Sequence, residues 1–489
     1  MNAQNAQNAP DTVPRFGLFE LELEGPAQGN PYKDVRLGAR FRSGPNYAEA
    51  EGFYDGDGIY RIRFMPCEEG EWTYVTESGC SSLDGIEGKF VCRAASPGEH
   101  GPVRVTNGVH FGHSDGTRYA PFGTTSLAWH LQSETLRSRT LQTLAEAPFN
   151  KLRMCVLPIA GGAGTDDFGL FPFEGSPQAG FDFTRFHPPY FAHLERCIKQ
   201  LAELGIQAEL ILFHPYGDRR WGFDRMRAED DDRYVRYVVA RLAAFSNVWW
   251  SLACEYDLLE HKRSEDWRRL FRIIGEYDSG GHVRSISGRT TWYDTGLPWI
   301  THASLRHADV KVASDCTRQY GKPAIIDECG AEGNLPDRWG SLTPEELVMH
   351  VWEGTFRGGY VGHSESYEHP DGLLWRLHGG LLRGESVPRI AFLRRIVEEA
   401  PARMLYTSDS YDAATISVRG EYYLQYFGLH RFAFREFALP EGQYKVDVID
   451  TWNMKVHELE GTFEGRFRID LPGELYYALR IRRAEGAKQ

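Results

Sequence analysis

The sequence predicts an α/β protein built around a (β/α)8 TIM barrel, with an N-terminal β-sandwich before it and a C-terminal antiparallel β-domain after it. Three observations lead to this prediction. Apolar and polar residues alternate near both ends of the chain, as they do in half-buried strands. Between residues 101 and 400, eight short apolar runs alternate with segments of helical period. The 489 residues also suffice for about three domains of roughly 100 to 200 residues each.

The first region, residues 1–98, has the two-residue period of a small antiparallel β-sandwich. Phe19 to Glu24, Val35 to Phe41 and Glu71 to Thr76 each alternate apolar and polar side chains. Short strands at this spacing are typical of sandwiches. The sequence Ser96-Pro97-Gly98 then predicts a linker, and we place the first domain boundary there.

The second region, residues 99–400, is expected to form the barrel because its apolar runs are nearly continuous. Strands that are buried on both faces lose the alternation of half-buried strands. We expect the eight strands within Tyr119–Trp129, Asn150–Pro158, Ile206–Tyr216, Val248–Glu255, His282–Ser287, Ile300–Leu305, Pro323–Glu328 and Gly359–Ser364. We expect helices at Thr135–Ala147, Pro189–Leu204, Asp232–Phe245, Trp267–Tyr277, Val310–Tyr320, Pro344–Arg357 and Pro388–Glu399, and none in the fifth connection, residues 288–299. An open doubly wound sheet is the competing architecture, but no G-x-G-x-x-G motif follows the first strand.

The third region, residues 401–489, returns to a two-residue period. Thr415 to Val418, Glu421 to Phe427, Tyr444 to Ile449 and Leu475 to Ile481 are expected strands. We therefore predict a C-terminal antiparallel β-domain that packs against the flank of the barrel.

Composition and charge narrow the function classes. The formal charge of −13 comes from 55 Lys and Arg against 68 Asp and Glu, without a basic block, which argues against nucleic acid and anionic membranes as partners. The eight cysteines form no CxxC pair, which favours free thiols in a reducing compartment. Met1 to Pro14 lacks the pattern of a signal peptide, and no apolar run reaches the roughly 18 residues of a membrane span. We expect a cytoplasmic protein without metal or cofactor, and a homo-oligomer stays open.

Two of the predicted barrel strands end in glutamates. Barrel enzymes build their sites at the carboxyl ends of the strands, where this sequence places Glu255 and Glu328. A glutamate at the end of an apolar strand is costly to bury without a partner or a proton. One such residue is as easily a structural carboxylate paired with an arginine. Two on opposite strands suit a retaining glycosidase, whose carboxyl groups lie about 5 Å apart.

Four segments of the chain resemble clan A glycoside hydrolases of the apiosidase-like (β/α)8 group, which carry an Ig-like N-terminal domain and a small C-terminal β-domain. These segments are Phe149–Met154, Asn247–Asp257, Lys322–Glu328 and, for the C-terminal domain, Asp447–Met454. The resemblance implies that Glu255 is the general acid/base and Glu328 the nucleophile. It also implies that Arg153 holds Glu328 ionised. The nearby Asp257 and Asp327 are rivals for the two roles, and we expect them to be supporting or solvated groups.

Cys254 departs from the pattern of this clan. The residue before the acid/base is usually an asparagine whose amide binds the 2-hydroxyl of the sugar, whereas a thiol is a weak donor and acceptor. Three explanations stay open. The 2-position of the sugar is unusual, a neighbour such as His214 or His302 has taken the role, or activity is lost.

Further residues at or near the predicted strand ends are candidates for substrate binding. Tryptophans stack on sugar faces, and histidine, tyrosine and carboxylate groups bind hydroxyls, but each has a structural alternative in the core or in an ion pair. None of the histidines has the H-x-H or H-E-x-x-H spacing of metal ligands. Besides Arg153 and Cys254, the candidates are Trp129, His130, His214, Tyr216, Trp292, His302, Glu365 and Trp375.

The leading hypothesis is a retaining glycoside hydrolase that removes a terminal sugar from an uncharged or weakly charged oligosaccharide or glycoside. Long insertions at residues 158–187 and 214–232 favour exo action, because they are placed to wall off one end of a cleft. The alternative is a carbohydrate-binding protein that lost catalysis through the change to Cys254. A third class, a metalloenzyme using the strand-end histidines, predicts inhibition by chelators.

Overall fold

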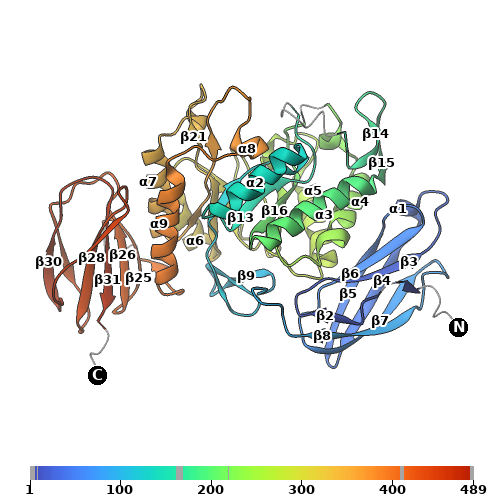
Figure 1. The fold of residues 1–489 in the computed structure, drawn as a ribbon, viewed down its shortest axis with the longest axis horizontal. Coiled ribbons are helices and arrows are strands. Elements are labelled where there is room, and N and C mark those ends of the chain that lie inside the picture. Colours follow the sequence, from blue (N-terminus) through green and yellow to red (C-terminus); the bar gives the residue numbers. More distant parts are fainter. Residues whose placement is uncertain (1–5, 8, 161–168, 218–219, 408–411, 485–489) are drawn as a thin grey trace.

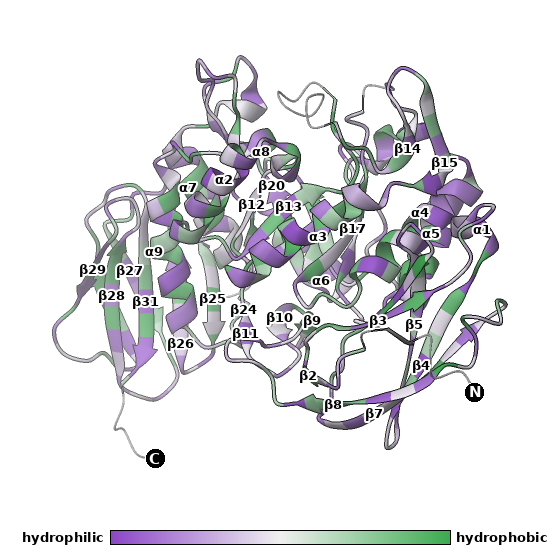
Figure 2. Ribbon diagram, turned by 45° about the vertical axis from the view of Figure 1, so that its right-hand side comes forward, coloured by the Kyte–Doolittle hydropathy of each residue, from purple (hydrophilic) through white to green (hydrophobic). Residues whose placement is uncertain are grey.

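In the computed structural model, which describes residues 6–7, 9–160, 169–217, 220–407 and 412–484, three parts follow one another along the chain (Figure 1). The N-terminal strands lie at the right of Figure 1, the helices and parallel strands in the middle, and the C-terminal strands at the left. The prediction of an α/β core between two β-rich regions is confirmed. Green apolar segments are concentrated inside the central part (Figure 2).

The N-terminal part is one eight-stranded sheet, counted over the described residues, that folds over on itself. Its order is β1-β3-β6-β5-β4-β7-β8-β2. The strands are β1 (Ala6–Gln7), β2 (Thr12–Pro14), β3 (Phe19–Glu24), β4 (Leu37–Ser43), β5 (Asn46–Tyr54), β6 (Ile59–Phe64), β7 (Gly70–Ser78) and β8 (Glu87–Arg93), with the short helix α1 (Pro31–Asp34) after β3. The ring of Phe19 on β3 stacks on Phe90 of β8 at 4.3 Å, although these strands are not neighbours in the sheet. The alternation along β3 therefore arises because one face of the strand lies between two layers.

The central part contains two parallel sheets, one of five strands and one of three. The first is formed by β12 (Gly123–Thr125), β13 (Lys151–Cys155), β16 (Gln207–Phe213), β17 (Val248–Ala253) and β18 (Arg284–Ser285), and the second by β19 (Ala303–Arg306), β20 (Ala324–Glu328) and β22 (Tyr360–Val361). Thr301 N donates to Arg284 O at 2.9 Å, and His363 N donates to Gly123 O at 2.8 Å. These bonds join the two sheets at both of their edges.

Helices follow most of the central strands, as the sequence predicts. They are α2 (Glu134–Glu146), α3 (Pro188–Glu203), α4 (Ala228–Leu242), α5 (Ser264–Tyr277), α6 (Val312–Tyr320), α7 (Pro344–Phe356), α8 (Trp375–His378) and α9 (Ser386–Glu399), with 3-10 turns η1 (Trp129–Leu131), η2 (Phe223–Arg225), η3 (Tyr256–Leu258) and η4 (Arg338–Gly340). Ser133 and Thr343 accept hydrogen bonds from the first turns of α2 and α7, which fixes where those helices begin. Residues 288–299 contain no helix, which was also expected.

The central part contains additional short strands that the sequence pattern does not predict. They are β9 (Val103–Thr106), β10 (His110–His113) and β11 (Arg118–Tyr119), the hairpin β14 (Phe173–Ser176) and β15 (Gly180–Phe186), and the pair β21 (Glu332–Gly333) and β23 (Glu365–Ser366). The hairpin lies in the insertion at residues 158–187, of which residues 161–168 are outside the described part. In the insertion at residues 214–232, residues 218–219 are outside it as well.

The C-terminal part is an antiparallel β-domain that packs on α7 and α9 (Figure 1). One sheet has the order β24-β25-β26-β31-β28-β29, and β27 pairs with β30. The strands are β24 (Leu405–Tyr406), β25 (Ala414–Val418), β26 (Tyr422–Tyr426), β27 (Phe434–Ala438), β28 (Tyr444–Asp450), β29 (Lys455–Glu458), β30 (Arg466–Asp470) and β31 (Tyr477–Arg483). The ring centroids of Tyr426 on β26 and Trp352 on α7 lie 5.6 Å apart, so aromatic packing contributes to this junction.

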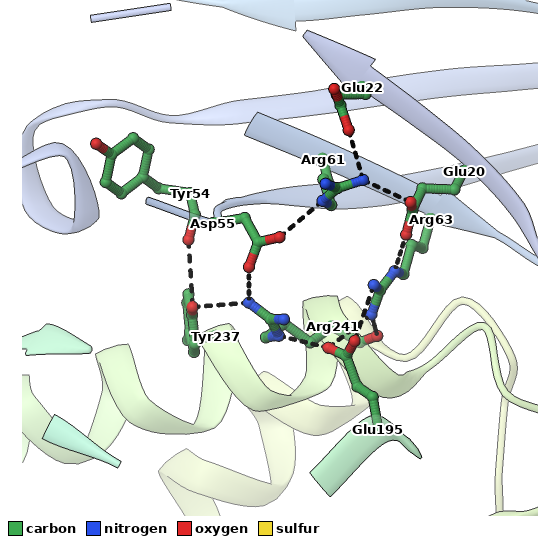
Figure 3. A network of polar contacts seen from close by, with 9 residues as sticks. All are labelled: Glu20, Glu22, Tyr54, Asp55, Arg61, Arg63, Glu195, Tyr237 and Arg241. Atoms are coloured by element: carbon green, nitrogen blue, oxygen red, sulfur yellow. Dashed lines mark hydrogen bonds and ion pairs between the residues drawn. The ribbon is translucent and has the colours of Figure 1, made fainter. Parts of the chain in front are cut away.

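A buried ion network holds the N-terminal sheet to α3 and α4 (Figure 3). Arg241 of α4 contacts Glu195 of α3 at 2.6 Å and Asp55, which follows β5, at 2.5 Å. Arg63 of β6 contacts the same Glu195 at 2.8 Å and Glu20 of β3 at 2.6 Å. Arg241 is 1% exposed, and a buried charge is costly without a partner. Carboxylates of the N-terminal part and of α3 supply the opposite charge.

Among the described residues, no helix is both long enough and apolar enough to cross a bilayer.

Candidate active site

Glu255 and Glu328 share one guanidinium group. Glu255 lies two residues after the end of β17, and Glu328 is the last residue of β20. Arg306, at the end of β19, places Nη1 2.9 Å from Glu255 Oε1 and Nε 3.2 Å from Glu328 Oε2. The structure therefore brings both predicted glutamates to the same end of the parallel strands.

The backbone at Glu255 is in the left-handed region, with φ 52° and ψ 47°. This conformation costs a residue with a Cβ on the order of 1 kcal/mol and is usually retained where a side chain needs a particular direction. Two hydrogen bonds hold the turn: Tyr256 N donates to Ser287 O, and Leu258 N donates to Glu255 O, both at 3.0 Å. The chain thus reverses between β17 and η3 and presents Glu255 toward Arg306.

Glu255 is only 4% exposed. Burial raises the pKa of its carboxyl, and the charges of Glu328 and Asp257 add to this, while Arg306 and Arg289 oppose it. The net direction is upward, which favours retention of a proton. A proton on this carboxyl is what a general acid needs.

Glu328 contacts a second arginine. Arg153 of β13 places Nη1 3.5 Å from Glu328 Oε1, and its Nε donates to Glu209 of β16 at 3.1 Å. The side chain of Glu328 is 14% exposed, more than that of Glu255 at 5%. Glu328 is therefore an accessible carboxylate between two guanidinium groups.

Asp327, a rival for the nucleophile, is committed to an ion network beneath the site. Its Oδ1 lies 2.8 Å from Lys151 Nζ, and its Oδ2 accepts from Ser304 Oγ at 2.5 Å. Burial alone would raise the pKa of Asp327, but Lys151 and Arg153 outweigh it and hold that pKa well below its usual range. Glu209 also contacts Lys151, so this network is balanced without Glu328.

Asp257, the rival for the acid/base, is occupied by the loop after β18. Its carboxylate accepts from the backbone N–H groups of Arg289, Thr290 and Thr291 at 2.7 to 3.0 Å. Burial opposes these bonds, yet they lower its pKa. Both aspartates thus have structural partners.

Cys254 is buried between Tyr216 and Arg153. Its Sγ lies 3.2 Å from Tyr216 Oη and 3.7 Å from Arg153 Nη2. Burial raises the pKa of the thiol, which keeps it neutral. The place of the usual asparagine amide is therefore taken by a thiol with a tyrosine hydroxyl beside it.

His214 has both ring nitrogens bound to backbone. Nε2 bonds Leu157 O at 2.9 Å, and Nδ1 accepts from Tyr216 N at 3.2 Å. Burial lowers the pKa of His214 to about 4, so the ring is neutral. Its ring stacks on Tyr216 with centroids 5.2 Å apart, which makes it a support for that tyrosine.

The prediction that His302 lies at the end of a strand is wrong. β19 begins at Ala303, so His302 precedes the strand and lies at the opposite end from Arg306. It packs between Phe111 and Trp249, and burial lowers its pKa to about 3. The apolar run Ile300–Leu305 placed the strand too early, because Thr301 bonds the neighbouring Arg284 before the strand proper begins.

Three further candidates are core residues. Trp129 and His130 in η1 are 0% exposed, and Trp375 in α8 is 2% exposed, with its Nε1 donating to Thr124 Oγ1 at 2.9 Å. Their burial favours the structural alternative over stacking on a sugar. Trp292 differs, because 42% of it is exposed and its ring lies edge-on to His307 at 5.6 Å. His307 adjoins Arg306, so the exposed ring of Trp292 lies near the residues that contact Glu255 and Glu328.

Glu365 belongs to a buried cluster with Glu332 and His363, whose ligand atoms lie within 4.8 Å of one another. Glu365 accepts from Arg383 N at 2.7 Å and Gly384 N at 2.8 Å, and burial raises its pKa to about 7. Glu332 accepts from the backbone N–H groups of residues 385 and 386, where α9 begins. Among the described residues this is the one group of three or more possible metal ligands that lie close together. Its two carboxylates already accept hydrogen bonds from backbone N–H groups.

Arg306 contacts both glutamates, and the sequence pattern does not reveal it. It is stacked over Trp339 of η4, with the guanidinium carbon 4.0 Å from the ring centroid. The available signal was the polar pair Arg306-His307 directly after the apolar run. The sequence pattern places the strand end at His302, four residues before Arg306.

The family model described as "Apiosidase-like, catalytic domain" matches residues 106–367. Two models described as domains of unknown function, DUF5060 and DUF5605, match residues 12–79 and 411–482. None of the curated proteins matches the chain at a significant level.

Two solved structures are similar to this one. A proposed glycoside hydrolase from Bacteroides vulgatus ATCC 8482 is 39% identical, with a TM-score of 0.92 over 97% of this chain and 100% of its own. A glycoside hydrolase family 5 protein from the same organism is 14% identical, with a TM-score of 0.62 over 79% of this chain and 94% of its own, which shows the fold alone. The fold and these matches define a glycoside hydrolase of the clan A type. The chain belongs to the apiosidase-like family.

Proposed function

We propose that this protein is a retaining glycoside hydrolase in which Glu328 is the nucleophile and Glu255 the general acid/base. The observation that carries the proposal is the contact of both carboxyl groups with Arg306. A single guanidinium between them supports a separation of about 5 Å, which suits retention, over the roughly 6.5 to 9.5 Å that inversion requires.

In the first step, a Glu328 oxygen attacks the anomeric carbon while Glu255 gives its proton to the leaving oxygen. The bond to the leaving group breaks, and an ester joins the sugar to Glu328. The raised pKa of Glu255 supports its role as the acid.

In the second step, Glu255 removes a proton from water, and the water oxygen attacks the anomeric carbon. The ester bond breaks and returns the carboxylate of Glu328. Arg153 contacts Glu328 and is itself held by Glu209, so it keeps this carboxylate in position through both steps.

We infer that the scaffold is a (β/α)8 barrel with its site at the carboxyl ends of the strands. The pairing of five and three parallel strands, together with the hydrogen bonds that join the two sheets at both edges, supports a closed ring. We also propose domain boundaries that divide the chain into residues 1–98, 99–400 and 401–489. The separate hydrophobic clusters of the N-terminal and C-terminal sheets support them.

We propose exo action on an uncharged or weakly charged terminal sugar. The hairpin β14–β15, in the insertion after β13, supports a cleft that is closed at one end. A cytoplasmic location also stays a proposal, and it is supported by the eight cysteines, all of which are unpaired.

A panel of 4-nitrophenyl pyranosides and furanosides tests the assignment. We expect Glu328→Gln to lower turnover by about 10⁴-fold or more and Glu255→Gln by about 10² to 10⁴-fold on the same substrate. Glu203→Gln, on the exposed end of α3, is the matched control and should keep full turnover. Near-normal turnover in either active-site variant would refute the catalytic role of that glutamate.

A further inference from the structure

Arg306 contacts both proposed catalytic carboxyl groups through different nitrogens. Nη1 lies 2.9 Å from Glu255 and Nε lies 3.2 Å from Glu328. The side chain is 19% exposed, and its guanidinium carbon lies 4.0 Å from the centroid of the Trp339 ring. A cation over an aromatic face is attracted by the electrons of the ring, and this attraction does not depend on which carboxyl group the cation bonds.

The reaction places opposite demands on the two carboxyl groups. In the free enzyme Glu328 is charged and Glu255 carries a proton, whereas in the covalent intermediate Glu328 is a neutral ester and Glu255 must be charged. A cation fixed on Glu255 would oppose the first step, because it would favour loss of the proton that Glu255 must donate. A cation fixed on Glu328 would have no charge to stabilise in the second step, because Glu328 is then a neutral ester.

We propose that Arg306 is a positioning residue that follows the negative charge, shared between Glu328 and Glu255 in the free enzyme and paired with Glu255 alone in the covalent intermediate. This inference rests on the proposed function. When the ester forms, the Glu328 oxygen that Arg306 bonds loses its charge, and the guanidinium turns fully to the Glu255 carboxylate. That carboxylate is the base that takes the proton of water, so its ionised form is stabilised in the step that needs it.

The other groups near Glu255 do not offer this exchange. Arg289 approaches Glu255 as a second cation but has no contact with Glu328, and Tyr216 and Cys254 are neutral. Among the described residues, Arg306 is the one cation that bonds both carboxyl groups. The charged and titratable groups that face Glu255 are Arg306, Arg289, Glu328, Asp257, Tyr216 and Cys254.

Two pH profiles separate the two states of the enzyme. The value of kcat/KM for a 4-nitrophenyl glycoside reports the free enzyme, where activity is lost as pH rises and Glu255 loses its proton. The value of kcat for the 2,4-dinitrophenyl glycoside of the same sugar reports the intermediate, because its leaving group needs no acid and breakdown of the ester limits turnover. There, activity is lost as pH falls and Glu255 gains a proton.

Arg306→Gln should move both profiles to higher pH, because a cation that favours the carboxylate is removed. We expect the shift for the intermediate to exceed the shift for the free enzyme by about one pH unit, since a cation in contact alters a carboxyl pKa by one to three units. Arg289→Gln is the matched control and should shift both profiles equally. Equal shifts in Arg306→Gln would show that the guanidinium stays fixed and would overturn the inference.

Azide and a lysine variant provide independent readouts. Azide attacks the ester without a general base, so it should speed breakdown of the intermediate in Arg306→Gln by at least about tenfold, and no acceleration would contradict the inference. Arg306→Lys keeps the charge but loses the planar fork, and it should restore at least half of the shift seen for the intermediate. If Arg306→Lys restored none of the shift, the shape of the guanidinium and not its charge would matter, and the inference would be contradicted.

The two proposals fail in different ways. If Glu328→Gln keeps its activity or the wild type inverts configuration, the proposed function fails whatever Arg306 does. If those results hold and the profiles of Arg306→Gln shift equally, only the role of Arg306 is refuted.

Discussion

At the scale of single residues, Tyr216 lies beside Cys254, the thiol that stands where related enzymes usually have an asparagine. Its hydroxyl lies 3.2 Å from the thiol of Cys254, while its ring is held by His214. A thiol is a poor partner for a hydroxyl, so we expect Tyr216 to supply the hydrogen bond at that point of the substrate.

Tyr216→Phe should therefore lower kcat/KM by about 10 to 100-fold, because a buried hydrogen bond to the substrate is lost. Cys254→Ala is the control and should cost less than about threefold. The measurement is kcat/KM on the best nitrophenyl glycoside of the panel. Full activity in Tyr216→Phe, or a large gain in Cys254→Asn from an inactive wild type, would refute this role, and the gain would favour the alternative of a degenerate enzyme.

The glutamates could be predicted from the sequence, and Arg306 could not. Glu328 is the last residue of β20 and Glu255 lies two residues after β17, so each apolar run ends at or close to the end of its strand. At β19 the apolar run starts at Ile300, three residues before the strand, and the strand continues to a polar residue. Pattern alone cannot tell a residue that enters a strand from one that leaves it.

At the scale of elements, Glu332 fixes the start of α9. It accepts from Glu385 N at 2.8 Å, Ser386 N at 3.2 Å and Tyr367 Oη at 3.0 Å, and it is 0% exposed. Gly384 is required beside it, because a Cβ there would lie 2.3 Å from Glu332 Oε2. The sequence showed neither contact, since residues 332 and 384 are distant along the chain.

We expect Glu332→Ala to destabilise the protein by at least about 3 kcal/mol, because several buried donors lose their acceptor and each costs about 1 to 3 kcal/mol. Chemical denaturation measures this loss. Glu385→Ala removes a side chain that is 68% exposed and should change stability by less than about 0.5 kcal/mol. Equal stability of the two variants would contradict the role of Glu332.

At the scale of the whole molecule, polar contacts join the N-terminal sheet to the central part, and aromatic packing joins the C-terminal domain to it. The three-part order could be predicted because the period of the apolar pattern changes from two to helical and back. The ion network of Figure 3 could not, since its members come from β3, β5, the turn after β5, β6, α3 and α4.

Arg241→Met should destabilise the protein by about 3 kcal/mol, because Glu195 and Asp55 lose the buried cation that they share and keep only Arg63 and Arg61 as partners. Lys89→Met, which removes an exposed pair with Glu71, is the control and should cost less than about 1 kcal/mol. Calorimetry at pH 7 measures both. A small effect in Arg241→Met would show that the network does not hold the junction.

The pH dependence of this effect has a defined sign. Burial would raise the pKa of Glu195, but Arg241 and Arg63 outweigh it and lower that pKa below 4.5. A lowered pKa stabilises the fold above pH 4.5, and this contribution is lost as pH falls through the pKa of the folded protein. The difference in stability between wild type and Arg241→Met should therefore narrow below pH 4.5, and a constant difference would refute the assignment.

The central claim is that Glu328 and Glu255 act as a retaining pair, and proton NMR of the first sugar released tests it most directly. With the best nitrophenyl glycoside of the panel as substrate, we predict that the newly formed sugar has the anomeric configuration of the glycosidic bond that was cleaved. An initial product of opposite configuration, before mutarotation, would contradict the claim.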